Sequence, residues 1–514
     1  MAHRQIVLGI DVGTSGTKVV AVSESGVVLA SATSGYEMYV PLAGYAEQNP
    51  DDWWQGTVLA VNDVLQQLRQ AGYSSDVASI SFSGQMHGLV PLDGEGRVIR
   101  PSIIWCDLRS ANEAQWLERT IGRDQIIKWT ENPPLPNFTV TKLLWMREHE
   151  PEAYARIQTM LLPKDYVRFK MTNAYAMDVA DASGTLLFDV AKRKWSKDMC
   201  QAVGIPVSWL PPIAESSDVV GYITKDASRQ LGIAQGTPVV AGAGDQAAGA
   251  MGLGIVDSGA VSAVFGTSGV VLAATDEPLR DPLGRLHTFC HAETGRWFVM
   301  GVTQAAGGSL QWYRRRLAQS EEAVASSTGQ DVYTLLMQEA GRVGSGADGL
   351  LFLPYLMGER TPHLNPDARG AWLGLEWRHE RSHMVRAVLE GVSFSLRDCW
   401  EAMAQIGVTA REWRVSGGGA QGALWMEIFA SVLDHDVQVM RGAQGPAYGA
   451  AILAAQGVSM LGHGQDAVYA WVKGGEEAVA NSAWAQRYQT LYPLYKQAYE
   501  LLQGHMKSLA DWQR

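Results

Sequence analysis

A four-residue motif, Gly-Thr-Ser-Gly, occurs twice in the chain, and this repeat most limits the folds that the sequence can adopt. The first copy spans residues 13–16 and the second spans residues 266–269, about half the chain apart. Each copy lies between two short apolar runs, at 6–10 and 19–22 in the first half and at 261–265 and 270–273 in the second. Each copy therefore predicts a β-hairpin with hydroxyl groups and backbone amides at its tip. Turn residues could repeat by coincidence, but the repeated apolar flanks favour two related halves.

The segments around the hairpins predict an alternation of helices and strands. Asn49 is a favoured helix N-cap and Pro50 a favoured first helical residue, so a helix is expected to begin there. Gly72 is expected to end this helix. Residues 383–405 predict a long apolar helix, and 77–82, 237–243 and 411–415 predict strands. We therefore expect an α/β protein with two similar domains facing each other across a cleft. The domain boundary is expected near 252–259, giving domains 1–254 and 255–514.

Composition excludes several classes of protein. The chain has 514 residues, of which 46% are hydrophobic and 18% charged, as in globular proteins of more than one domain. Its formal net charge of −11 and the lack of a dense basic run argue against a nucleic-acid partner. The four cysteines are far apart and form no C-x-x-C pair, which argues against a disulfide framework or a zinc site.

Two features of the sequence bear on location. The N-terminal apolar run is too short for a signal peptide, and the longest uncharged stretch, 442–465, contains Pro446 and several glycines, so it is a poor membrane span. We expect a cytoplasmic protein without a membrane partner. The sequence does not define the oligomeric state, and a homodimer is compatible with it.

The first hairpin follows a carboxylate, Asp11, and leads into Thr17 and Lys18. Glycines let a backbone approach phosphate oxygens, amides and hydroxyls donate to them, and a carboxylate can hold Mg²⁺. The segment is not a Walker A loop, because the spacing differs and no helix is expected after it. The pattern favours a polyphosphate site, and the alternative is an ordinary hairpin with an exposed acid.

A glycine-rich turn at 416–422 follows a predicted strand and precedes a helix expected to begin near Ala423. Gly417, Gly419 and Gly422 match the G-x-G-x-x-G pattern of dinucleotide-binding folds. In that fold an acid ends the next strand, whereas here Asp434 and Asp436 precede it. We therefore favour a purine or ribose site at this turn, and a dehydrogenase remains an alternative.

Asp245 and Gln246 follow an apolar strand and are surrounded by small residues. Burying an isolated carboxylate is costly unless it has a purpose. The pattern favours a functional acid at Asp245. The alternative is a helix N-cap, because Asp is a favoured cap and a small-residue helix follows.

Two further segments combine polar groups with an aromatic ring or a thioether, the mixture that suits a sugar. Residues 83–88 contain Gln85, Met86 and His87, and residues 105–109 contain Trp105, Asp107 and Arg109. Each has a structural alternative: His87 could be a buried structural histidine, and the acid and arginine a surface ion pair.

Together these motifs resemble the FGGY family of carbohydrate kinases over nearly the whole chain. The resemblance extends to residues 141–145, 162–166, 370–375 and 387–390, and residues 85–88 are most similar to members that phosphorylate xylulose. It implies two actin-like (ribonuclease H-like) domains that close over ATP and a sugar, flanking a catalytic cleft. Its implied reaction is transfer of the γ-phosphate of MgATP to the terminal hydroxyl of D-xylulose.

The resemblance also implies a role for each candidate residue. Asp245 is similar to the general base of the family, and Asp11 to the acid associated with Mg²⁺. The implied sugar-side residues are Gln85, Met86, His87, Trp105, Asp107, Arg109 and Gln246. The implied ATP-binding residues are Gly13, Thr14, Ser15, Thr17, Lys18, Gly266, Thr267, Ser268, Gly417, Gly418 and Gln421. Two alternatives stay open: a family member acting on ribulose, fuculose, gluconate or glycerol, and an actin- or chaperone-like ATPase switch.

Overall fold

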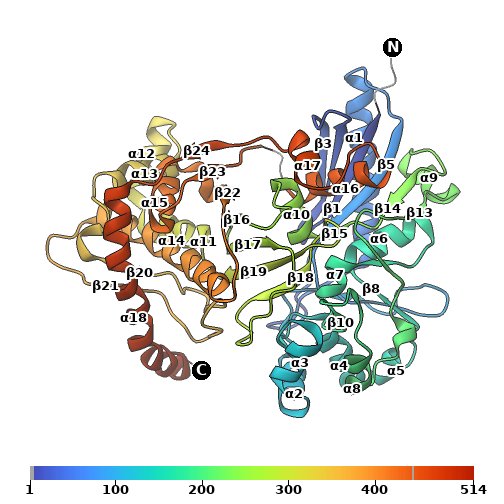
Figure 1. Ribbon diagram of the computed structural model, residues 1–514, viewed down its shortest axis with the longest axis horizontal. Helices are drawn as coiled ribbons and strands as arrows, with labels where there is room; N and C mark the ends of the chain where they lie inside the picture. The colour runs from blue at the N-terminus through green and yellow to red at the C-terminus, as the bar shows by residue number, and fades with distance from the viewer. Residues whose placement is uncertain (1–4, 443–444, 514) are drawn as a thin grey trace. The chain divides into compact units, whose positions relative to one another are not determined.

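The computed structural model describes residues 5–442 and 445–513, which form two compact units (Figure 1). Unit 1 comprises residues 1–257, 274–298 and 442–473, and unit 2 comprises residues 258–273, 299–441 and 474–514. The units are thus not two contiguous halves of the chain, because each half contributes segments to unit 1. The division into domains 1–254 and 255–514 stays a prediction.

Unit 1 contains a sheet in which an antiparallel hairpin is continued by parallel strands. Its order is β13(Val219–Tyr222)-β14(Pro238–Val240)-β5(Val77–Gly84)-β1(Ile6–Val12)-β2(Gly16–Ser23)-β3(Val28–Gly35), and β15(Ala243–Gly244) also pairs with β5. Strands β1, β2 and β3 are successively antiparallel, whereas β5 runs parallel to β1 and β14 runs parallel to β5. The expected strand at 237–243 is divided in two because Gly242 has φ +83°, a left-handed conformation that favours glycine.

Helices cover both faces of this sheet. On one face, Ile6, Leu8 and Ile10 of β1 pack with residues of α1(Pro50–Gln70) and α6(Pro163–Thr172) in one hydrophobic core. Because side chains alternate along a strand, Gly9 faces the other side, where α16(Pro446–Gly457) approaches so closely that a Cβ on Gly9 would lie 1.9 Å from the carbonyl oxygen of Ala447. The small residues of α16 therefore make it a core helix.

The other elements of unit 1 surround this sheet. Its further helices are α2(Ala111–Thr120), α3(Arg123–Thr130), α4(Thr139–His149), α5(Pro151–Tyr154), α7(Val179–Ser183), α8(Lys197–Val203), α9(Lys225–Leu231), α10(Asp245–Leu253) and α17(Gln465–Trp471). Its short strand pairs are β4(Glu47–Gln48) with β7(Ser102–Ile103), β6(Val90–Leu92) with β8(Thr159–Leu161), β9(Met177–Asp178) with β12(Ile213–Ala214), and β10(Phe188–Asp189) with β11(Lys194–Trp195).

A second seven-stranded sheet repeats the arrangement. Its order is β18(His287–Cys290)-β19(Trp297–Thr303)-β17(Gly269–Thr275)-β16(Ala260–Phe265)-β22(Glu412–Ser416)-β23(Val437–Val439)-β24(Glu476–Ala478). As in the first sheet, an antiparallel hairpin, here β16 and β17, continues into parallel strands, here β22 and β23. The repeated order is that of two actin-like (ribonuclease H-like) α/β domains, so the expected fold class is confirmed.

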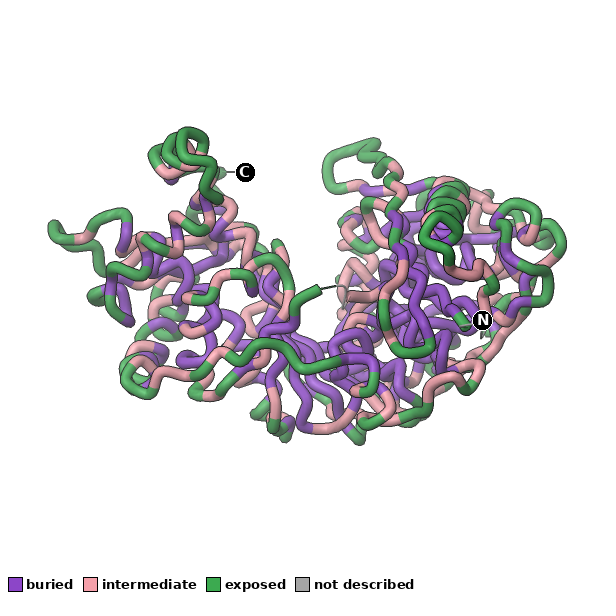
Figure 2. The backbone as a smooth tube through the Cα atoms, turned by 90° about the horizontal axis from the view of Figure 1, so that it is seen from above, coloured by how far each residue is buried: buried purple, intermediate pink, exposed green. Residues whose placement is uncertain are grey.

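Of this second sheet, β16, β22, β23 and β24 belong to unit 2, whereas β18 belongs to unit 1. Unit 2 also contains helices. They are α11(Gly307–Leu317), α12(Gln319–Thr328), α13(Val332–Gly341), α14(Arg381–Gln405), α15(Ala423–Leu433) and α18(Ser482–Gln513), and a short pair joins β20(Leu351–Leu353) to β21(Ala371–Leu373). Helix α14 begins two residues before the predicted 383 and ends as predicted at 405. In each unit the sheet strands are mostly buried, whereas the last turns of α18 are mostly exposed (Figure 2).

None of the helices within 5–442 and 445–513 combines the length and the hydropathy that a membrane crossing needs.

Candidate active site

The first hairpin is bound from behind by side chains of unit 1. The Gly13 amide donates to the Gly16 carbonyl at 3.1 Å, closing the turn. The Gly13 carbonyl accepts from the Tyr36 hydroxyl at 2.6 Å, and the Thr14 carbonyl accepts from Nε2 of Gln48 at 2.7 Å. Three carbonyl groups at the tip are therefore used inside the protein, an arrangement that suits an anion at the outer side of the turn.

The hairpin residues expected to contact phosphate differ in exposure. Ser15 and Lys18 are exposed and Thr14 is half-buried, whereas Thr17 is fully buried. The Thr17 hydroxyl is therefore inside unit 1 in this structure, and of the predicted set Ser15 and Lys18 are the residues most open to solvent.

Asp11 lies at the end of β1, opposite Lys18 on β2 and beside Ser83 on β5. Burial raises the pKa of its carboxyl group, and the nearby Ser83 hydroxyl and the charge of Lys18 only partly oppose this. Its Oδ1 atom is buried and accepts no hydrogen bond within the described part of the chain. A buried carboxylate oxygen without a partner, beside a phosphate-type hairpin, fits a role in holding Mg²⁺.

Asp245 begins α10, directly after β15. The N-cap of this helix is Gly244, and Asp245 is its first residue, so the alternative that Asp245 caps the helix is wrong. Burial raises the pKa of Asp245 to about 7, and the negative charge of Asp11 adds to the rise. Gln246 donates to Asp245 Oδ1 at 3.4 Å, a long contact. A carboxyl group tuned near neutral pH suits a general base.

The segment between β5 and β6 packs against the start of α10. Met86 is 5% exposed, and a Cβ on Gly244 would lie 2.8 Å from Met86 Cγ, so these two residues are in direct contact. His87 has φ 69°, and its Nδ1 lies 2.7 Å from the Gly184 carbonyl oxygen. The fold thus brings residues 86–87 and Asp245, which are far apart in sequence, to one place.

Aromatic rings surround His87. Phe138 lies edge-on to it with ring centroids 5.0 Å apart, and Phe289 lies 6.3 Å away in the same kind of contact. The Thr139 hydroxyl donates to the His87 carbonyl at 3.1 Å. Sequence analysis did not single out Phe138 or Phe289, because each is a single aromatic residue outside the motifs described above.

Trp105 lies next to the first hairpin. The residue is 41% exposed, and its Nε1 donates to the Thr14 hydroxyl at 2.8 Å. The predicted sugar-side segment and the predicted phosphate turn are therefore in contact within unit 1.

Asp107 and Arg109 are engaged by the protein itself. Their side chains are buried, and Arg109 Nη2 lies 2.7 Å from Asp107 Oδ2, while Arg109 Nη1 lies 2.7 Å from Glu47 Oε1. The guanidinium group also lies over Tyr45 and Trp145, at 3.9 and 4.9 Å from their ring centroids. In this structure the pair supports the segment that carries Trp105, and a direct sugar contact stays untested.

Three buried carboxylates in unit 1 could resemble a metal site, but a lysine lies among them. Lys164 Nζ lies 2.6 Å from Asp165 Oδ1, 2.5 Å from Asp178 Oδ2 and 3.2 Å from Asp181 Oδ2, and all four side chains are buried. The ammonium group supplies the positive charge that a metal would bring. This cluster does not include Asp11, the predicted metal-associated acid.

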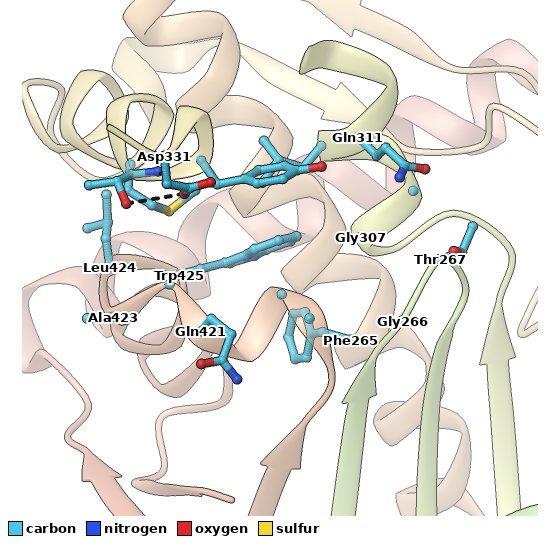
Figure 3. Close-up of a pocket in the computed structure, with 18 of the residues that line it drawn as sticks. Phe265, Gly266, Thr267, Gly307, Gln311, Asp331, Gln421, Ala423, Leu424 and Trp425 are labelled. Atoms are coloured by element: carbon cyan, nitrogen blue, oxygen red, sulfur yellow. Dashed lines mark hydrogen bonds between the residues drawn. The ribbon is translucent and has the colours of Figure 1, made fainter. Parts of the chain in front are cut away.

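Unit 2 contains a pocket of about 830 Å³ beside the second hairpin (Figure 3). Gly266 and Thr267 of the hairpin lie at one end, and Gly418, Gln421 and the start of α15 line another side. Ser268 and Gly417 do not belong to the lining, although Gly417 shapes it: its φ is +97°, and a Cβ there would lie 2.6 Å from the Phe265 carbonyl oxygen.

The far wall of this pocket was missed by sequence reasoning. It comes from α11 and from the start and first turns of α13, with Trp425 and Phe265 below in edge-to-face contact, ring centroids 5.2 Å apart (Figure 3). Its residues include Gln311, Asp331, Tyr333, Thr334, Met337 and Gln338. No motif marks these residues, because only the packing of α13 beside α15 gives them a common surface. The mixed apolar and polar lining suits a purine ring and a ribose.

Comparison with known proteins agrees with this geometry. The N-terminal domain of the FGGY family of carbohydrate kinases matches residues 6–252, and the C-terminal domain of that family matches residues 261–458. The chain belongs to the FGGY family of carbohydrate kinases, which confirms the family resemblance.

Individual relatives narrow the comparison. The xylulose kinase of Bacillus subtilis (strain 168) is 38% identical over 493 residues, covering 96% of this chain and 96% of that protein. The gluconokinase of the same organism is 30% identical and covers 99% of this chain and 98% of its own length. The structure of ligand-bound xylulose kinase from Lactobacillus acidophilus has a TM-score of 0.91 at 26% identity, covering 98% of this chain and 100% of that chain.

Proposed function

We propose that this carbohydrate kinase transfers the γ-phosphate of ATP to the terminal hydroxyl of D-xylulose and yields D-xylulose 5-phosphate. The observation that carries the proposal is the contact of Met86 with Gly244, which places the predicted sugar-side segment beside the predicted base, Asp245. The xylulose kinases among the relatives support the same substrate.

In the proposed reaction Asp245 accepts the proton of the attacking hydroxyl. Its pKa of about 7 leaves a large fraction ionised at neutral pH. The rings of Phe138 and Phe289 beside His87 would exclude water from a sugar bound there. Positioning and charge neutralisation supply most of the acceleration, because the transition state of phosphoryl transfer needs little covalent help.

ATP is proposed to use both hairpins. The pocket of unit 2 would take the adenosine, with Gly418 and Gln421 in its lining. Thr14, Ser15 and Gly266–Ser268 would donate to phosphates, and Gly13, whose amide closes the first turn, would let the backbone approach them. Asp11 would hold Mg²⁺, which would neutralise charge on the phosphates. Transfer requires that the γ-phosphate reach the sugar held by unit 1.

A coupled ADP-release assay with a sugar panel tests the proposal. Xylulose should give the highest kcat/KM among xylulose, ribulose, fuculose, gluconate and glycerol. A higher kcat/KM for gluconate than for xylulose would favour the activity named for the gluconokinase relative. ADP release without any sugar, at the same rate as with sugar, would indicate an ATPase switch instead.

His87→Ala provides the internal control for the sugar site. The variant should raise the KM for xylulose and leave the KM for ATP nearly unchanged, because His87 lies in unit 1 beside Phe138 and outside the lining of the unit 2 pocket. A large loss of ATP affinity without a change in the KM for xylulose would contradict the assignment of His87 to the proposed sugar site.

Three expectations from the sequence stay predictions: the domain division at 254/255, the cytoplasmic location, and the homodimer. Light scattering of the purified chain measures the last of these directly.

A further inference from the structure

Gln48, on β4, was not singled out by any sequence motif, yet its side-chain amide has four hydrogen-bond partners. Its Nε2 donates to the Thr14 carbonyl at 2.7 Å and to the Glu37 carbonyl at 3.4 Å. Its Oε1 accepts from Trp53 Nε1 at 3.1 Å and from Gln85 Nε2 at 2.8 Å. A primary amide has two donors and two acceptor lone pairs, so every group of this side chain is used.

Two of these partners belong to different parts of the proposed site. Thr14 lies at the tip of the first hairpin, and Gln85 directly precedes Met86 and His87. Gln85 also reaches the hairpin itself, because its Nε2 lies 3.3 Å from the Gly13 carbonyl oxygen. A chain of amide contacts therefore runs from the phosphate turn through Gln48 and Gln85 to the sugar-side segment.

The surroundings of Gln48 hold its side chain in one orientation. Its side chain is completely buried, and Gln85 is 1% exposed. A buried polar group that loses its partner is costly, so an amide held by four bonds cannot rotate without leaving several groups unsatisfied. A displacement of the hairpin tip must therefore move Gln48 or break its bond to Thr14.

We propose that Gln48 is a positioning residue that couples the first phosphate hairpin to the sugar-side segment, so that binding of ATP changes the affinity for the sugar. The inference rests on the proposed function, since it assigns the two loops to the two substrates. Coupling between two sites is a reciprocal free energy, and position between them is not by itself proof of it. The test must therefore measure coupling and not activity alone.

The experiment compares the Kd of a non-hydrolysable ATP analogue with and without saturating xylulose, by titration calorimetry. In the wild-type protein the ratio of the two values should differ from one. Gln48→Glu keeps the size and both acceptors but removes the two donors, so the Thr14 and Glu37 carbonyls lose their partner. The ratio of the two Kd values should move toward one by a factor of about five or more, which corresponds to the low end of typical coupling free energies.

Asn132→Asp is the matched control. Asn132 is also completely buried, and its Nδ2 donates to the carbonyls of Thr130 at 3.0 Å and Thr288 at 2.8 Å. The change removes two donors from a buried amide that bonds neither the hairpin nor residues 85–87, so the ratio should stay at the wild-type value. Equal ratios in Gln48→Glu and Asn132→Asp would overturn the inference, as would a wild-type ratio of one.

Trp53→Phe keeps the proposal testable if Gln48→Glu does not fold. It removes a single donor to Gln48 Oε1 and should shift the ratio in the same direction by less. An unchanged ratio in a folded Trp53→Phe protein would then count against the link. Failure of the proposed function would be recognised by a different result, because the wild-type protein would then not phosphorylate xylulose at all.

Discussion

The two hairpins carry the same four residues, but the protein builds them differently. In unit 1, Val12 pairs with Thr17, which leaves a four-residue turn; in unit 2, Phe265 pairs with Gly269, which leaves three. Asp11 precedes the first turn by two residues, and the corresponding residue before the second turn is Val264. A carboxylate two residues before the turn therefore occurs in the first copy alone.

The groups that hold the two turns also differ. The first is held by the side chains of Tyr36, Gln48 and Gln85, whereas the second is held by backbone amides. The amides of Gly307 and Gly308 donate to the carbonyls of Gly266 and Thr267 at 2.8 and 3.0 Å. The comparison teaches that the same four residues form turns of different length, and that the neighbouring parts of the fold decide which groups hold each turn.

A buried carboxylate supports the second turn indirectly. Glu359 is 3% exposed, and it accepts from the Thr303 hydroxyl at 2.7 Å and from the Gln304 amide at 2.9 Å. These residues join β19 to α11, where Gly307 and Gly308 lie. Glu359 of unit 2 thus holds backbone and a hydroxyl group, whereas Asp11 Oδ1 in unit 1 accepts no hydrogen bond within the described residues.

The largest effect should come from Asp245, the predicted base in unit 1. Asp245→Asn keeps the shape but removes the proton acceptor, so kcat should fall by about 10²- to 10⁴-fold while both substrates still bind. ADP release and sugar phosphate formation should fall together, and the melting temperature should not drop. Near-normal turnover by a folded variant would reject the base assignment.

The second turn should be disrupted through its backbone support. A Cβ on Gly307 would lie 2.6 Å from the Gly266 carbonyl oxygen, so Gly307→Ala must displace the turn. The KM for ATP should rise about tenfold or more, with the KM for xylulose little changed. Gly344→Ala, also in unit 2, is the control, because a Cβ there meets nothing within 4 Å. Equal KM values for ATP in the two variants would show that the second turn does not contact the nucleotide.

The pH profile should show the raised pKa of Asp245. Since a base must be ionised, kcat/KM should fall as the pH drops below about 7, to about one-tenth of its plateau near pH 6. In the folded protein Asp245 stays protonated up to about pH 7, whereas in the unfolded chain it loses its proton near pH 4. Asp245 therefore lowers the free energy of unfolding progressively as the pH rises from about 4 to 7. Asp245→Asn should therefore gain more in melting temperature at pH 8 than at pH 5. A flat kcat/KM profile between pH 6 and 8 would contradict the assignment.

The smallest effect should come from the contact between Trp105 and the first turn. Trp105→Phe removes the donor to the Thr14 hydroxyl and keeps most of the ring, so it loses one hydrogen bond of about 0.5–1.5 kcal/mol. The KM for ATP or for xylulose should rise about two- to tenfold. Trp377→Phe is the matched control, since Trp377 is fully exposed in unit 2 and should give wild-type values. Identical KM values for Trp105→Phe and Trp377→Phe would show that the hydrogen bond of Trp105 does not contribute to substrate binding.

The sequence by itself determined the local elements and the class of protein. Asn49 and Pro50 set the start of α1, the small residues of 446–457 set a core helix, and the two Gly-Thr-Ser-Gly copies set two hairpins. These features follow from backbone preferences and side-chain periodicity, which act over a few residues. The motif resemblance then gave the family, because those motifs extend over the whole chain.

Only the tertiary structure decided which residues meet and which are already occupied. It placed Met86 against Gly244, buried Asp107 with Arg109, and made Gln48 the link between two loops. It also gave the pocket a wall from α13 that no motif marks. These contacts join residues far apart in the sequence, and they depend on packing and on satisfying buried polar groups, which no local pattern encodes.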